Sequence, residues 1–159
     1  MGQLYAVLVS GSAIGIENPE VFPDYVFTAS SEYADHGARH SRLNDAAYWA
    51  AASGGVNNDW IQVDLGELRS LVGIATQGSQ CGSDSAWWEW VETYIIQYSI
   101  DGTNYESIPG TFSGNTQCGE EPVRNEFSLI SARYVKIWPT QVHGWASMRF
   151  ELFEGIPFP

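Results

Sequence analysis

Residues 90–102 read WVETYIIQYSIDG, and this stretch decides the fold class. It is rich in aromatic and β-branched residues. Five of its apolar side chains share one face: Trp90, Tyr94, Ile96, Tyr98 and Ile100. This pattern predicts a strand with one buried face and with Trp90 in the core. The Asp-Gly pair that ends the stretch is a strong hairpin signal, and residues 105–108 then return the chain. The sequence therefore predicts an antiparallel hairpin here.

Short runs of the same kind recur along the chain, separated by turn residues. They cover residues 60–65, 71–76, 126–129, 134–138 and 147–153. Helix-period patterns are nearly absent, and many short strands joined by turns are typical of an antiparallel sandwich or barrel. We find no internal repeat and no low-complexity linker, so we predict one domain over residues 1–159.

Charge limits the classes of partner. Seven Lys and Arg residues stand against 19 Asp and Glu residues, which gives a formal net charge of −12. Such a surface repels phosphate, so no nucleic-acid partner is expected, and anionic lipids are disfavoured for the same reason. A neutral ligand, a cationic ligand or a bound cation fits better. No run approaches the roughly 20 apolar residues that cross a bilayer.

The chain holds two cysteines, Cys81 and Cys118, each flanked by Gly, Ser or Asn residues that are typical of loops. We predict a disulfide between them, because exposed free thiols are a liability outside reducing compartments. Two free thiols in a reducing compartment are the alternative. Residues 1–10 lack a basic start and a long apolar run, so they do not resemble a signal peptide. Either a signal peptide was removed from this chain, or the protein is not secreted by the signal-peptide route.

Seven blocks, in order and spacing, resemble the discoidin family, also known as the coagulation factor 5/8 type C domain. They are residues 28–33, 41–44, 59–66, 76–78, 98–102, 132–137 and 148–152. The resemblance implies an all-β fold: a galactose-binding-like jelly-roll β-sandwich of about eight antiparallel strands, with its core at about residues 14–155. It also implies that ligands bind at spike loops at one end. Ligands in this family include sugars, phospholipid membranes, collagen and peptide ends.

Three departures from the family pattern narrow these possibilities. The usual disulfide between the two ends is missing, because residues 10–12 and 155 contain no cysteine. Neuropilin-type members hold a terminal arginine with a Thr and an Asp after the first loop tryptophan, whereas residues 49–54 read WAAASG here. Coagulation-factor members insert an apolar first spike into membranes, whereas residues 33–40 read YADHGARH. The arginine pocket is therefore absent, and membrane insertion is disfavoured.

The two predicted spike loops carry the candidate ligand-binding residues. Sugar hydroxyls both donate and accept hydrogen bonds, so a sugar site needs polar side chains beside an aromatic face. At least one of the adjacent Trp87 and Trp88 must be exposed, because neighbouring side chains cannot both face the core. The candidates are Tyr33, His36, Arg39, His40, Trp49, Asp84, Trp87, Trp88 and Glu89. The alternatives are a solvated first spike, and a tryptophan that only covers the sandwich end.

Two further expectations concern charged side chains. Residues 43–49 resemble the calcium loop of carbohydrate-binding discoidin relatives, which implies a structural Ca²⁺ held by Asp45 and Glu151. Calcium takes about six to eight oxygens, and these two residues supply only part of that set. We also expect Arg149 and Asp64 to form a partly buried ion pair.

These observations together predict a binding module without catalytic activity. The three histidines are His36, His40 and His143, and the sequence has no HExxH, GxSxG or phosphate-loop motif. We predict an extracellular or cell-surface lectin-like module that binds carbohydrate through its spike loops in cell adhesion. The alternative is an adhesion module of a larger extracellular protein, with a protein partner or membrane phospholipid as its ligand.

Overall fold

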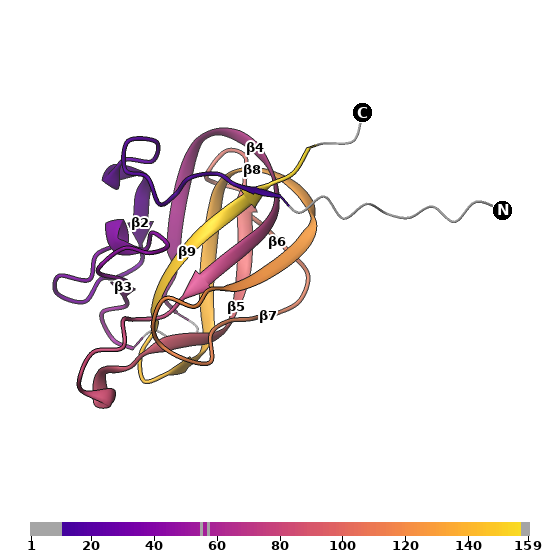
Figure 1. Ribbon diagram of the computed structural model, residues 1–159. Helices are drawn as coiled ribbons and strands as arrows, with labels where there is room; N and C mark the ends of the chain where they lie inside the picture. The colour runs from indigo at the N-terminus through magenta and orange to yellow at the C-terminus, as the bar shows by residue number, and fades with distance from the viewer. Residues whose placement is uncertain (1–10, 55, 57, 157–159) are drawn as a thin grey trace.

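A computed structural model describes residues 11–54, 56 and 58–156, and the expectation for residues 1–10 lies outside this part (Figure 1). Nine strands carry the fold: β1 (Ser12–Ala13), β2 (Phe27–Ala29), β3 (Trp49–Ala50), β4 (Ile61–Gln77), β5 (Trp90–Ser99), β6 (Glu106–Ser107), β7 (Phe112–Ser113), β8 (Val123–His143) and β9 (Ser147–Glu154). Three single-turn 3₁₀ helices interrupt the loops, at η1 (Asp24–Val26), η2 (Ala38–His40) and η3 (Ser85–Trp87). In the described residues, no helix is long and apolar enough to cross a membrane.

The strands form two layers that share β4 and β8. In the first layer, residues 61–64 of β4 pair with β2 on one side and with residues 134–137 of β8 on the other, and β5 continues the sheet. In the second layer, residues 69–77 of β4 lie between β8 and β9, and β1 pairs with β9. All these pairings are antiparallel, which confirms the predicted all-β sandwich.

β4 and β8 are longer than the sequence predicts. Gly66 was expected to end a strand, but the chain bends there with a φ of 79° and pairing resumes at Arg69. The Asp64 carboxylate accepts a hydrogen bond from the Gly66 N–H at 2.8 Å and stabilises this bend. Two predicted strands therefore become one, which passes from the first layer into the second.

A β-bulge changes which residues of β5 are buried. Pairing with β8 shifts register between Val91 and Tyr94, so Val91 and Tyr94 are both buried although they are three positions apart. Trp90 turns away from the core and stacks on His143, with ring centroids 3.9 Å apart. The prediction of Trp90 in the core was therefore wrong. Ile100, expected on the buried face, is 63% exposed beyond the end of β5.

Candidate functional site

The candidate site is a cavity of about 110 Å³ at one end of the sandwich. It lies between the first loop (residues 30–48), the second loop (residues 78–89) and the turn that joins β8 to β9. We name it the loop cavity, and its walls are Tyr33, His36, Tyr48, Ala50, Trp87, Glu89 and Trp145. The site is thus built from three segments that are far apart in the sequence.

Aromatic rings form much of the cavity wall. The Tyr33 ring meets the Trp145 ring edge-on, with centroids 5.6 Å apart, and the His36 ring stacks on Tyr48 at 4.2 Å. Trp87 is 68% exposed and Tyr33 is 50% exposed. Two large apolar faces therefore remain open to solvent beside the cavity.

Three polar side chains meet among these rings. The Glu89 Oε2 atom accepts a hydrogen bond from the Ser147 hydroxyl at 2.7 Å. Burial, and then the nearby Glu89 carboxylate, raises the pKa of Tyr48, so its phenol stays neutral and keeps its proton. The His36 Nδ1 atom is buried without a hydrogen-bond partner among the described residues. A buried polar atom without a partner is uncommon, and a bound ligand would satisfy it.

Backbone contacts fix the first loop against β3. Tyr33 donates its N–H to the Ala50 carbonyl at 2.9 Å, and Ala50 donates to the His36 carbonyl at 3.1 Å. His36 donates to the Tyr33 carbonyl at 2.8 Å and closes a tight turn between them. Tyr33 and His36 are therefore held side by side at the cavity mouth.

In the second loop, η3 sets the position of Trp87. The Asp84 carboxylate caps this turn by accepting the Ala86 N–H at 2.9 Å. The indole N–H of Trp88 donates to the Gly82 carbonyl at 2.8 Å, which ties that ring to its own loop. Of the tryptophan pair, Trp88 is half-buried and Trp87 is the one presented to solvent.

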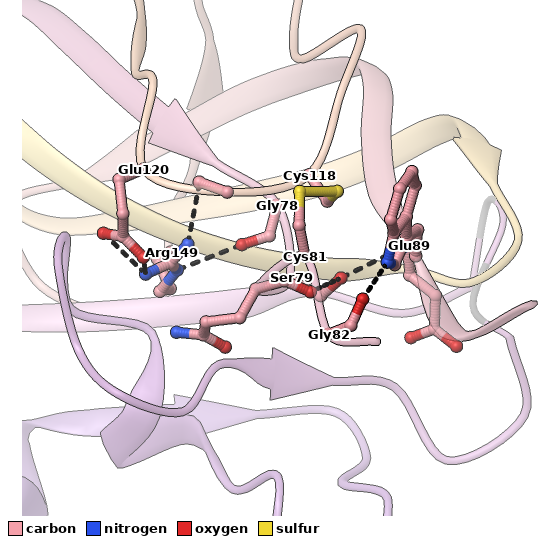
Figure 2. Close-up of a disulfide and its surroundings, with 11 residues drawn as sticks. Gly78, Ser79, Cys81, Gly82, Glu89, Cys118, Glu120 and Arg149 are labelled. Carbon is pink, nitrogen blue, oxygen red and sulfur yellow. Dashed lines mark hydrogen bonds and ion pairs between the residues drawn. A yellow bond between two sulfur atoms is a disulfide. The ribbon is translucent and has the colours of Figure 1, made fainter. Parts of the chain in front are cut away.

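The predicted disulfide joins Cys81 in the second loop to Cys118, with Cα atoms 5.2 Å apart (Figure 2). A second link lies beside it, because the Gly119 N–H donates to the Ser79 carbonyl at 2.7 Å. The second loop is therefore attached by a covalent bond and a hydrogen bond to the segment before β8.

Arg149, on β9, holds three loops together beside the disulfide. Its side chain is 0% exposed, and it donates to the carbonyls of Gly78, Asp45 and Gly119 at 2.9–3.0 Å. Figure 2 shows the bond to Gly78. Arg149 also pairs with Glu120 at 3.0 Å. The expected Arg149–Asp64 pair was wrong, because Asp64 pairs with Arg133 at 2.8 Å. The Asp64 carboxyl has a lowered pKa, chiefly through its hydrogen bond with Arg133.

Four of the predicted site residues meet at the loop cavity: Tyr33, His36, Trp87 and Glu89. Arg39 lines a different hollow, beside Asp24 and Tyr25, and donates its Nε–H to His40 at 3.2 Å. His40 lies 3.4 Å from the Asp45 carboxylate. Asp84 and Trp88 take part in the structure of the second loop, as described above.

Trp49 requires a correction. It was predicted as a ligand contact, but its side chain is 0% exposed and its indole N–H donates to the Ser31 carbonyl at 3.0 Å. As the first residue of β3 it packs into the core, and its neighbour Tyr48 reaches the cavity instead. Adjacent residues of an extended segment point to opposite sides, which explains the exchange.

The two predicted calcium ligands are already hydrogen-bonded. Glu151 is buried, and its carboxylate accepts the N–H groups of Ile16 at 3.1 Å and Leu152 at 2.9 Å. Burial raises the pKa of Glu151, and these backbone hydrogen bonds oppose the rise. Asp45 accepts the Ala47 N–H at 2.8 Å. An ion held by these two carboxylates would share them with these backbone donors.

Sequence reasoning missed Tyr48 and Trp145. Trp145 follows Gly144, which has a φ of 73° in the turn before β9, and its indole N–H donates to the Ala51 carbonyl at 2.5 Å. The available signals were an aromatic residue beside a turn glycine and the alternation of Tyr48 with the buried Trp49. Neither signal shows that these rings meet the first loop.

Comparison with known proteins gives one family match. The model of the F5/8 type C domain matches residues 26–152. The chain is 33% identical to human neuropilin-1 over 147 residues. This match covers 89% of this chain but 16% of that protein. The chain therefore spans about a sixth of the length of this curated relative.

Two solved structures show the same fold at low sequence identity. Wild-type discoidin II from Dictyostelium discoideum superposes with a TM-score of 0.76 at 21% identity, over 92% of this chain and 58% of that one. Chitosan-binding module 2 of a Paenibacillus chitosanase/glucanase, solved in complex with chitotriose, gives a TM-score of 0.60 at 20% identity, over 80% of this chain and 94% of that one. At these identities the likeness concerns the fold alone.

Proposed function

The chain belongs to the F5/8 type C domain family, and from this premise we propose that it is a non-catalytic module that binds carbohydrate in the loop cavity. At about 110 Å³, the cavity is smaller than the roughly 300–1,000 Å³ of pockets that bury drug-sized ligands. A site of this size suits one unit at the end of a glycan. The wider glycan would lie across the exposed rings of Trp87 and Tyr33.

One observation supports this proposal most strongly. The buried His36 Nδ1 atom has no hydrogen-bond partner in the described part of the chain, and it lines a cavity with aromatic rings, a phenol and a carboxylate. A pyranose presents an apolar C–H face and a rim of hydroxyls, which match rings and hydrogen-bonding atoms respectively. A sugar hydroxyl or amine that donates to His36 would satisfy that buried atom.

The proposal has two further parts, which concern the location of the protein and a bound calcium ion. The Cys81–Cys118 disulfide supports an extracellular or cell-surface location, because disulfides persist in oxidising environments. Calcium at Asp45 and Glu151 stays a proposal, with backbone carbonyls of residues 43–49 as the further oxygens. A structural ion there would hold the first loop in place and so affect sugar binding without contacting the sugar.

A glycan array tests the proposal directly. The purified chain is applied with calcium and with a chelator, and bound signals are competed with free monosaccharides. Trp87→Ala should abolish the signal, whereas the control Leu68→Ala, which also removes an exposed apolar side chain but from β4, should leave it unchanged. A blank array, or equal signals for the two variants, would refute carbohydrate binding in the loop cavity.

A protein ligand is the alternative function, and one feature favours it. Val21 and Tyr25 are 51% and 82% exposed, and Tyr25 lines the hollow that also contains Arg39. Exposed apolar side chains next to charged ones are typical of protein interfaces. This alternative predicts binding to a protein partner that free sugars do not inhibit. Binding to liposomes without sugar competition would instead support a membrane ligand.

A further inference from the structure

We infer that the loop cavity selects an amino sugar in its protonated form, with Glu89 as the counter-charge. This inference rests on the proposed carbohydrate-binding function and names the class of ligand. It concerns the terminal unit of the glycan, whose ammonium group would enter between the aromatic rings and meet the carboxylate.

The charges of the cavity support a cation. Among the seven lining residues, Glu89 is the only one with a formal charge, and His36 is a neutral acceptor when its Nδ1 atom carries no proton. The cationic Arg149 behind the second loop is already paired with Glu120, and Arg39 lies in a separate hollow. Nothing on the cavity wall therefore neutralises Glu89.

The free hydrogen-bonding capacity of the wall also fits an ammonium group. The Glu89 carboxylate accepts from Ser147 through Oε2, which leaves Oε1 as an acceptor. The His36 Nδ1 atom is buried and unpartnered among the described residues. An ammonium group has three donors, so it can serve both acceptors at once, whereas a hydroxyl has one. A bond from an ammonium to a carboxylate is also stronger than one between neutral groups.

The rings add a second attraction for positive charge. Tyr33, Tyr48, Trp87 and Trp145 line the same cavity as Glu89, and aromatic faces attract cations within about 6 Å. A carboxylate or sulfate on a sugar would instead face Glu89 and these same rings. The cavity should therefore reject acidic sugars as well as prefer amino sugars.

The overall charge of −12 attracts every cation, so the test must separate this general effect from the cavity. Glu89→Gln removes one charge inside the cavity. Glu92→Gln is the matched control, because Glu92 lies three residues away on β5, is exposed, and is not among the lining residues. Both variants make the net charge less negative by one unit.

The experiment is a calorimetric titration of the wild type and both variants with three trisaccharides: chitotriose, its N-acetylated form and the neutral cellotriose. It is run at about pH 7, where an ordinary amine is protonated and an ordinary imidazole is mostly neutral, and at about 0.15 M salt, which screens distant charges. We expect wild type and Glu92→Gln to bind chitotriose at least tenfold more tightly than the other two sugars, on the order of one charge-assisted hydrogen bond. Glu89→Gln should lose this preference and bind chitotriose no more tightly than cellotriose.

The outcomes distinguish this inference from the function on which it rests. If wild type binds chitotriose and cellotriose equally, and Trp87→Ala weakens both, the cavity binds sugar and the amine preference is refuted. If Glu89→Gln and Glu92→Gln weaken chitotriose equally, the preference comes from net charge and the role of Glu89 is refuted. If none of the three sugars binds while another glycan binds on the array, only the amino-sugar inference fails. If no glycan binds in either assay, the proposed function fails with it.

Discussion

Removal of the disulfide gives a stability change that can be calculated from its position. The bond joins residues separated by 37 positions. In the chain-entropy model, closing a loop of that length removes about 13 cal/mol/K from the unfolded chain, or roughly 4 kcal/mol at 25 °C. Replacing Cys81 and Cys118 together by alanine should therefore lower the free energy of unfolding by about 3–4 kcal/mol.

Urea unfolding followed by tryptophan fluorescence measures this loss. The slope of the unfolding free energy with urea should rise in the variant, because an uncrosslinked unfolded chain exposes more surface. Wild type treated with a reductant provides the control and should shift to the midpoint of the variant. A loss below about 1 kcal/mol would refute the reasoning and would mean that the bond does not restrict the unfolded chain. The folded variant should retain the Ser79–Gly119 hydrogen bond.

Three further predictions concern single side chains. Arg149→Met keeps the volume but removes a donor from three loop carbonyls and from Glu120, so it should cost about 3–5 kcal/mol in urea unfolding. A change below about 1 kcal/mol would mean that water replaces the guanidinium. Trp87→Ala should change stability by less than about 0.5 kcal/mol, because the ring is exposed, and a larger loss would show a structural role. Burial raises the pKa of Tyr94 from 10.0 to about 12. The folded state therefore keeps a proton that the unfolded state releases above about pH 10, so this contribution to stability is present below that pH and is lost as the pH rises toward 12. Between pH 8 and 11 the wild type should lose about 1.4 kcal/mol relative to Tyr94→Phe in urea unfolding, and parallel pH profiles would contradict the assignment.

The sequence predicted the sandwich because alternation and turn residues are local signals. The strand at residues 90–99 was visible in it, whereas Gly66 was expected to end a strand and instead forms a bend within β4. Burial of Val91 in place of Trp90 was not visible, because the bulge depends on the register of β5 against β8, which pairs residues about 50 positions apart. The continuity of β4 through Gly66 likewise depends on a neighbouring strand.

The candidate site was predicted in part for the same reason. Tyr33, His36, Trp87 and Glu89 lie in loops whose composition marks them as exposed, and the structure brings them together. Tyr48 and Trp145 come from segments far apart in the sequence, which are brought together by the pairing of β3 with β9. Trp49 was misplaced because composition does not tell which of two adjacent aromatic residues faces inward. Contacts made across distant segments thus remain outside the reach of local patterns.

The pairing of β1 with β9 determines how this domain can be joined to a larger protein. Ser12 lies opposite Glu154, so the first and last strands run antiparallel at one edge of the fold, at the upper right of Figure 1, whereas the first loop lies at the left and η3 at the lower left. Two linkers joined at these positions would leave side by side, so a host protein could carry the module as a side branch without separating its own flanking segments. The loop cavity would then face outward from the host, and several such branches on one scaffold would add their weak single-site affinities into avidity.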